Sequence, residues 1–196
     1  MSEAERSTSA RVGSILFRHR GWLPVPFLLV PLLASGTPDA MNWVLGILLI
    51  VIGEVIRLAG VAAAGTVTRR RSRTVQRLVT YGIFAWMRNP LYVGNFLIWI
   101  GFIVISDVLW FMPVAVLLFA IEYTLIVRYE EGVLESIFGA EYLAYKHRTA
   151  RWFPRPPAND DDGEHHWDEA WRSEASTFLQ YAVLAGLFVA KQHYRW

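Results

Sequence analysis

The feature that most restricts the fold of this chain is the apolar run MNWVLGILLIVIGEVIRLAGVAAA at residues 41–64. A helix of this length rises about 36 Å, which exceeds the roughly 30 Å hydrocarbon core of a bilayer. Further apolar runs lie at residues 22–36, 90–106, 108–129 and 176–190, and only 18% of the residues are charged. The sequence therefore predicts an all-α, polytopic membrane helical bundle of four to five transmembrane helices.

Two of these runs are ambiguous. As a helix, residues 22–36 would rise only about 22 Å, and they contain three prolines. We therefore expect a kinked or partly re-entrant span there. Residues 176–190 are also of borderline length, and they fit a fifth span, a re-entrant helix or an interfacial helix.

The distribution of charge orients the spans. Basic clusters precede the first span, separate the second from the third, and follow the fourth. Four crossings place all three clusters on one side, which the positive-inside rule assigns to the cytoplasm. A complete fifth crossing would put the basic tail KQHYRW outside, in mild conflict with that rule. We expect an integral membrane protein whose active site faces the cytoplasm.

The alternation of apolar runs and charged stretches divides the chain into segments. Apolar residues recur at helical spacing from residue 130 to residue 148, which predicts a cytoplasmic amphipathic helix that is ended by prolines. The expected segments are a cytoplasmic basic arm at 1–21, four transmembrane helices within 22–129, a cytoplasmic helix and tail at 130–156, an acidic linker at 157–175 and a C-terminal apolar helix at 176–196.

Some polar residues lie where an apolar span or a linker is predicted. Glu54 and Arg57 stand at i,i+3 inside the run 41–64, so their side chains share one helix face. Charges at that depth face a partner or a cavity, and we favour mutual neutralisation that fixes helix packing. His165 and His166 have no third ligand at convincing spacing and the chain has no cysteine, so we expect no metal site.

The segment RNPLYVG at residues 88–94 stands at the edge of the third apolar run. Pro90 suits the first position of a helix, and Asn89 suits its N-cap. The helix start then presents free backbone N–H groups beside the charge of Arg88, and together these can seat a carboxylate. The alternative is an ordinary capped helix with Arg88 extended toward lipid headgroups.

Two more polar or aromatic pairs follow the fourth run. Glu130 and Glu131 are adjacent, so they point about 100° apart on a helix and one of them can face a pocket. Tyr142 and Tyr145 share a face at i,i+3, where aromatic rings can stabilise a cation. Solvated carboxylates and tyrosines anchored at the membrane interface are the alternatives.

The three stretches RNPLYVG, RYEE and FGAEYLAYKHRTARWFP together resemble the membrane methyltransferase superfamily of isoprenylcysteine carboxyl methyltransferases and phospholipid N-methyltransferases. That family shows an Arg-His-Pro-x-Tyr-x-Gly segment, a tight two-helix hairpin, a Glu-Glu pair, then Phe-Gly-x-x-Tyr-x-x-Tyr and an Arg-x-x-Pro tail. The resemblance covers residues 80–155. The matching positions are Arg88, Asn89, Pro90, Tyr92, Gly94, Glu130, Glu131, Phe138, Gly139, Tyr142, Tyr145, Arg151 and Pro154.

The resemblance implies S-adenosyl-L-methionine as the cofactor, covered by the helix and tail at 130–156. It implies catalytic roles for Arg88, Glu131 and Arg151. It implies cofactor-binding roles for Asn89, Pro90, Tyr92, Gly94, Glu130, Tyr142 and Tyr145. Asn89 departs from the family pattern because it replaces the histidine. An amide still forms hydrogen bonds but does not titrate near neutral pH, so a general-base role at that position is lost.

The expected activity is S-adenosylmethionine-dependent methyl transfer to a carboxyl or amine group of a lipidic or amphiphilic acceptor within the membrane. The expected partners are this acceptor and membrane lipids, with no nucleic acid. One alternative is a steroid-reductase-like, NADPH-dependent membrane oxidoreductase, because such proteins have a comparable Asn-x-Pro-x-Tyr-x-Gly segment. Another is a non-catalytic membrane scaffold whose arginine-rich loop binds anionic headgroups.

Overall fold

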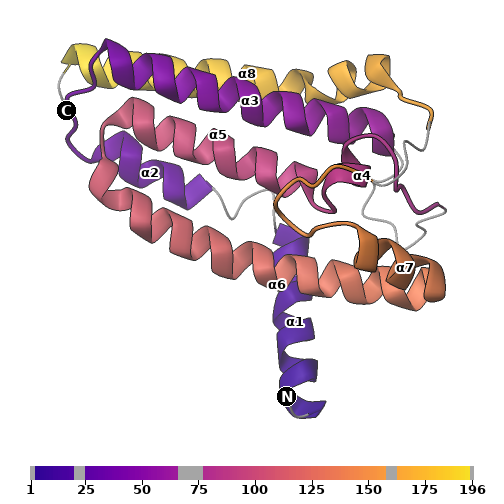
Figure 1. Cartoon of the computed structure of the whole chain (residues 1–196). Coiled ribbons are helices and arrows are strands. Elements are labelled where there is room, and N and C mark those ends of the chain that lie inside the picture. Colours follow the sequence, from indigo (N-terminus) through magenta and orange to yellow (C-terminus); the bar gives the residue numbers. More distant parts are fainter. Residues whose placement is uncertain (1–2, 20–24, 66–76, 158–162, 195–196) are drawn as a thin grey trace.

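Helix α3 runs the length of the molecule and packs against both α5 and α8 (Figure 1). The computed structural model describes residues 3–19, 25–65, 77–157 and 163–194. Helix α6 lies along the other side of α5, and α1 packs against α6. The elements are α1 (Glu3–His19), α2 (Val25–Leu33), α3 (Ala40–Ala64), α4 (Ile83–Trp86), α5 (Pro90–Ser106), the 3₁₀ turn η2 (Leu109–Phe111), α6 (Met112–Phe138), α7 (Ala140–Arg148) and α8 (Trp167–Tyr194).

The bundle has helices of membrane length. Helix α3, the stretch Leu109–Phe138 and α8 are each long and apolar enough to cross a membrane, and α5 is a shorter apolar helix. The outward face of α3 exposes Val44, Leu48, Val51 and Val55, a surface suited to lipid chains rather than to water. The predicted all-α membrane helical bundle is thus confirmed.

The first apolar run forms a shorter helix than a full span requires. Helix α2 has nine residues and so rises about 14 Å, less than half the hydrocarbon core. Pro31 lies inside it, and a proline removes one donor from the helical ladder. A helix this short agrees with the kinked or partly re-entrant segment expected at 22–36, and the division of 22–129 into four transmembrane helices stays a prediction.

The C-terminal helix is longer than predicted, because α8 begins at Trp167 rather than at residue 176. The second half of the expected acidic linker thus forms its first turns, where Asp168 and Glu169 lie at the helix end that favours anions. At the other end, the ammonium group of Lys191 is buried and donates to the carbonyl of Pro31 at 2.6 Å. This contact gives one charge of the basic tail a partner inside the protein.

The amphipathic helix predicted at 130–148 is interrupted. Helix α6 continues through Glu130 and Glu131 to Phe138, and α7 follows after Gly139. Gly139 has φ 51°, a left-handed conformation that costs glycine little and other residues more. The glycine of the Phe-Gly motif therefore turns the chain so that α7 folds back beside α6.

The hairpin between α5 and α6 agrees with the predicted tight turn. Helix α5 ends at Ser106, and its C-cap Asp107 has φ 58°, a conformation in which aspartate is enriched. The Asp107 carboxylate accepts a hydrogen bond from the backbone N–H of Thr37 at 3.3 Å. Pro113 lies in the first turn of α6, where a proline is well tolerated.

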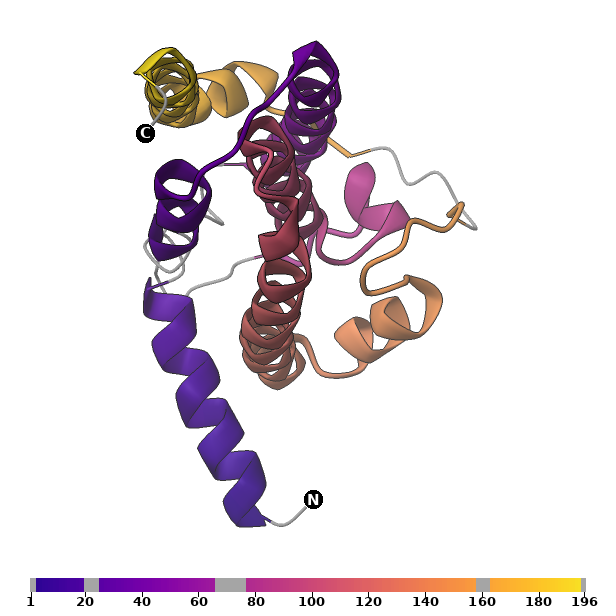
Figure 2. The same ribbon diagram turned by 90° about the vertical axis from the view of Figure 1, so that its left-hand side faces the viewer.

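Helix α1 covers most of the predicted basic arm and lies against α6, with the ring centroids of Phe17 and Tyr129 5.8 Å apart. Figure 2 shows α1 and α2 on one side of the α5–α6 pair, with α4 and α7 on the opposite side. The arginine run at 69–73, on which the scaffold alternative depends, lies outside the described residues.

Helices α3 and α5 approach each other through two reciprocal pairs of glycines. A Cβ added at Gly94 would lie 2.5 Å from the carbonyl oxygen of Gly53, and one at Gly101 would lie 2.7 Å from that of Gly46. Contacts below about 3.0 Å are not tolerated by real side chains. Glycine at these positions therefore lets the two antiparallel backbones touch, as small residues do in membrane bundles.

We expect Gly94→Ala to lower the unfolding temperature of the detergent-purified protein, because overpacking of this kind costs about 1–3 kcal/mol. Gly186→Ala is the matched control, since nothing lies within 4 Å of a Cβ added at that position in α8. Equal unfolding temperatures for the two variants would show that close approach is not what requires glycine at position 94.

A buried polar network joins α3 to α5 and α8. The Arg57 guanidinium donates to both carboxylate oxygens of Glu174 on α8, at 3.0 and 3.1 Å. It also pairs with Glu54 at 3.3 Å and donates to Asn95 on α5. The expected neutralisation of Glu54 by Arg57 is therefore correct. A second carboxylate, that of Glu174 in the segment predicted to be a linker, also pairs with Arg57.

Glu174→Gln is expected to destabilise the protein by about 2 kcal/mol, because it replaces charged hydrogen bonds from Arg57 with weaker ones to a neutral amide, while Glu54 still compensates the Arg57 charge. Asp168→Asn in the exposed first turn of α8 serves as a control, which loses at most about 1 kcal/mol of helix-dipole interaction. Thermal unfolding in detergent measures both, and indistinguishable curves for the two variants would contradict a structural role for the network.

Candidate active site

The three motif-bearing stretches converge at the end of the bundle where α5 begins. The backbone N–H of Arg88 donates to the carbonyl of Ala150 at 2.8 Å, and Met87 forms an isolated parallel β-bridge with Ala150. The Arg88 guanidinium then donates to the carbonyls of Lys146, at 2.7 Å, and Thr149. The segment before α5 is thereby bound to the tail that follows α7.

Glu131 on α6 is the buried carboxylate at the centre of this convergence, with 5% of its surface exposed. Its Oε1 accepts from Arg88 at 3.0 Å. Arg151 donates to both oxygens, from Nε at 3.0 Å and from Nη2 at 2.6 Å. Lys146 Nζ lies 3.8 Å from Oε2. We call Arg88, Glu131, Lys146 and Arg151 the Glu131 cluster.

The cluster satisfies the conditions for burying a charge. The paired hydrogen bonds from Arg151 match the planar fork of the guanidinium to the carboxylate, and Arg88 supplies a second cation. Glu130, the neighbouring residue on α6, is only half buried. The two adjacent glutamates therefore lie in different environments, as their helical geometry predicted.

Asn89 and Pro90 occupy the predicted positions at the start of α5, as N-cap and first helical residue. The Asn89 side chain does not cap the helix, which corrects one expectation. Its Nδ2 instead donates to the carbonyl of Arg151 at 3.0 Å. The amide thus ties α5 to the tail and leaves the first N–H groups of α5 without a side-chain cap.

Tyr92 and Gly94 take part in helix packing. Tyr92 belongs to a buried group with Tyr123 and Ile126, and its ring centroid lies 4.6 Å from that of Tyr123. Gly94 faces α3, where it contacts Gly53. Both residues therefore help to position α5, and the cofactor-binding role expected of them stays a prediction.

Tyr142 and Tyr145 on α7 are both buried, and their ring centroids are 6.0 Å apart. The Tyr145 hydroxyl donates to the carbonyl of Phe84 in α4 at 2.8 Å. Burial raises the pKa of both hydroxyls, and for Tyr142 the nearby Glu131 carboxylate adds to the rise. Both phenols therefore stay neutral, and Tyr145 holds α7 against α4.

An open groove lies beside the cluster. Its walls are Ile83 and Trp86 from α4, the following residue Met87, and Pro154 from the tail, and they border about 370 Å³ of free space. The backbone N–H of Arg155 donates to the carbonyl of Trp86 at 3.0 Å, which fixes the two walls relative to each other. The Trp86 side chain is 44% exposed.

Sequence reasoning did not identify Lys146, Trp86 or the pairing of the two backbone segments. Lys146 lies inside the stretch FGAEYLAYKHRTARWFP, which resembles the family, but one lysine on an amphipathic helix gives no distinctive signal of function. Trp86 stands two residues before the motif at 88–94, in a position that suited an interfacial anchor equally well.

Comparison with known proteins identifies the class to which this fold and site belong. The model of the phospholipid methyltransferase family matches residues 41–141. The chain is 34% identical over 118 residues to protein-S-isoprenylcysteine O-methyltransferase A of Arabidopsis thaliana, covering 56% of this chain and 57% of that protein. It is 34% identical over 119 residues to the human protein-S-isoprenylcysteine O-methyltransferase, covering 57% and 40%.

A longer match is to the cobalt-zinc-cadmium resistance protein CzcN of Cupriavidus metallidurans, with 33% identity over 150 residues, 75% of this chain and 69% of that protein. The chain therefore belongs to the phospholipid methyltransferase family, within the superfamily of membrane methyltransferases that its motifs indicated. It spans about half the length of the isoprenylcysteine methyltransferases named above. No solved structure matches it.

Glu131→Gln is expected to lower the free energy of unfolding by about 3 kcal/mol or more, because it leaves two arginines facing a neutral amide in a buried setting. Glu135→Gln is the control. That residue pairs with Lys146 near the surface, where one ion pair contributes about 0–1 kcal/mol. Thermal unfolding in detergent compares the two, and an effect no larger at Glu131 than at Glu135 would contradict the central role of Glu131.

Proposed function

We propose that this chain transfers a methyl group from S-adenosyl-L-methionine to a lipidic or amphiphilic acceptor within the membrane. The observation that carries the proposal is the Glu131 cluster. It brings the three stretches that resemble membrane methyltransferases together around one buried carboxylate, beside an open groove. Family membership supports the same reaction class.

The residues at this place fit the methyl donor. Arg88 Nε is buried and has no hydrogen-bond partner among the described residues, so it can donate to the carboxylate of the methionine moiety. The groove offers the exposed indole of Trp86 to an adenine ring. When bound there, S-adenosylmethionine would supply a methyl group activated by a sulfonium. The further proposed contacts are Asn89, Pro90, Tyr92, Gly94, Glu130, Tyr142 and Tyr145, of which Tyr92 and Gly94 also position α5.

The chain's own residues suit this chemistry by orientation rather than by covalent catalysis. Methyl transfer depends on aligning acceptor, methyl group and sulfur, and on excluding water. Glu131 fixes Arg88 and Arg151 in place, and Arg151 keeps 33% of its side chain exposed, so it can position an acceptor carboxylate. An amine acceptor must first lose a proton. Glu130 is the proposed base for that case, because Glu131 is already held by two arginines.

The proposed setting is a bundle whose α5 start, α6 end and α7 face the cytoplasm, with α7 and the tail through residue 156 covering the cofactor. The basic clusters that the sequence places on one side of the membrane favour that orientation. A polar cofactor then enters from the water, and a lipidic acceptor enters laterally from the bilayer. Relatives named as isoprenylcysteine O-methyltransferases support an acceptor with a large apolar part.

The decisive measurement is ligand-dependent thermal stability of the detergent-purified protein, followed by transfer of a radiolabelled methyl group to extracted lipids. We expect S-adenosylhomocysteine to raise the unfolding temperature and NADPH to leave it unchanged. Stabilisation by NADPH alone would instead support the reductase-like alternative. Stabilisation by neither, with no labelled lipid, would support a scaffold.

Arg88→Lys tests the site itself. It keeps the positive charge beside Glu131 but removes Nε, so we expect the affinity for S-adenosylhomocysteine to fall roughly tenfold, the loss expected for one hydrogen bond to a charged group. Arg128→Lys, at an exposed position of the same helix that carries Glu131, should bind as the unaltered protein does. Unchanged affinity in Arg88→Lys would remove Arg88 from the cofactor site.

A further inference from the structure

Helix α8 is the membrane-length helix that the rest of the bundle covers least. Only 11% of its apolar window is buried inside the protein, compared with 33% for α3 and 28% for the stretch Leu109–Phe138. Its covered face packs on α3 and α5, and Phe188 stacks on Phe102 with ring centroids 5.9 Å apart. Because α8 lies at the edge of the bundle beside α3 (Figure 2), much of its circumference faces lipid in a single copy of the chain.

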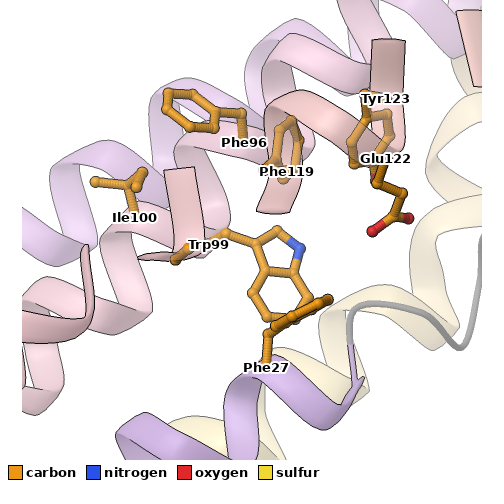
Figure 3. A pocket seen from close by; sticks show the side chains of 8 residues that line it. Phe27, Phe96, Trp99, Ile100, Phe119, Glu122 and Tyr123 are labelled. Atoms are coloured by element: carbon orange, nitrogen blue, oxygen red, sulfur yellow. The ribbon is translucent and has the colours of Figure 1, made fainter. Parts of the chain in front are cut away.

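Three polar side chains within the other apolar helices are turned inward. The Glu54 carboxylate of α3 accepts a hydrogen bond from the Tyr181 hydroxyl at 2.9 Å. Asn95 of α5 donates to the Tyr123 hydroxyl at 3.3 Å. Glu122 of α6 lies inside the bundle among aromatic rings (Figure 3). An inward direction is the ordinary arrangement for a polar group at membrane depth.

Gln180 of α8 is turned outward instead. It lies within the apolar run at 176–190, about 4.5 Å along the helix from the middle of that run, and it is exposed. Its amide has no hydrogen-bond partner among the described residues. Hydrocarbon supplies none either, so an amide facing lipid loses the hydrogen bonds that it forms in water. The position of Gln180 therefore calls for a polar partner from outside this copy of the chain.

Gln180 belongs to a regular stripe on the uncovered side of α8. Starting at residue 176, the stripe continues at alternating intervals of four and three residues, and it comprises Ser176, Gln180, Val183, Leu187, Ala190 and Tyr194. All six are exposed except Ala190, which is half-buried. This spacing keeps one stripe of a helix against a neighbouring helix over several turns, as in a left-handed helix pair. We call these six residues the Gln180 seam.

We propose that the Gln180 seam is the contact surface between two copies of this chain, with α8 of one copy packed parallel to α8 of the other. Two copies inserted in the same direction are related by a twofold axis along the membrane normal, so a residue on the seam meets its own counterpart at the same depth. An amide carries both donors and an acceptor. The two Gln180 side chains therefore satisfy each other, as glutamines do between membrane helices.

This pairing leaves the Glu131 cluster uncovered. Helix α8 packs on α3, whereas α6 and α7 lie on the other side of α5 (Figure 1). In the dimer the two clusters consequently lie on the outer sides of the assembly, away from the α8 contact.

The chain has no cysteine, so single cysteine variants report the contact without background. We expect Val183→Cys to form a disulfide-linked dimer when copper-phenanthroline is added to the full chain in phosphatidylcholine liposomes at a low protein-to-lipid ratio. Val189→Cys is the matched control. The two valines are 56% and 55% exposed, but they lie about 120° apart around the helix. Cross-linking of Val183→Cys should therefore be several-fold faster.

Gln180→Met tests the amide itself, because it keeps the length of the side chain and removes its hydrogen-bonding groups. We expect the dissociation constant of the dimer to rise roughly tenfold, the effect of losing two interhelical hydrogen bonds. Energy transfer between fluorophores at the amino termini of two copies in the same liposomes measures this constant. Val189→Met is the control and should associate as the unaltered chain does.

Neither measurement uses a methyl donor or acceptor, so the proposal stands apart from the function proposed for the Glu131 cluster. A chain that is monomeric at every protein-to-lipid ratio would overturn it. So would equal cross-linking of the two cysteine variants, or a dissociation constant that Gln180→Met leaves unchanged.

Discussion

The contact between the Glu131 carboxylate and two guanidinium groups holds the functional end of the molecule together. Arg88 enters from the segment before α5 and Arg151 from the tail after α7, two places 63 residues apart in the chain. A buried carboxylate requires such partners, so the position of Glu131 on α6 dictates where both segments must lie. The groove lined by Trp86 and Pro154 follows from this arrangement.

The requirement that a buried charge has a partner also governs the apolar part of the bundle. Arg57 on α3 pairs with Glu54 on the same helix and with Glu174 on α8, and it donates a hydrogen bond to Asn95 on α5. Lys191 is matched by a backbone carbonyl. In a low-dielectric setting each of these contacts fixes helix orientation, because the alternative is an uncompensated charge. Within the described residues, Glu54 and Glu122 each keep one buried carboxylate oxygen without a hydrogen-bond partner.

Local sequence signals predicted the helical class, the tight hairpin between α5 and α6, the start of α5 at Pro90 and the family. These features depend on apolar length, on turn chemistry and on short motifs, all of which are visible along the chain. The pairing of Arg57 with Glu174, the pairing of Arg88 with Glu131, and the bridge between Met87 and Ala150 depend on contacts distant in sequence. Sequence pattern alone also could not show that α8 begins at Trp167, because its first turns are polar and are stabilised by tertiary ion pairing.

Helix α5 is in backbone contact with α3 through paired glycines, but it contacts α6 mainly through side chains. The turn at Asp107 joins α5 to α6 at one end, and the salt bridge between Arg88 and Glu131 joins the two helices at the other end. Between these two ends, α5 and α6 are joined by aromatic side chains, such as Tyr92 with Tyr123 and Phe96 with Phe119. Bulky side chains therefore hold the two backbones apart here, whereas glycines let α5 touch α3.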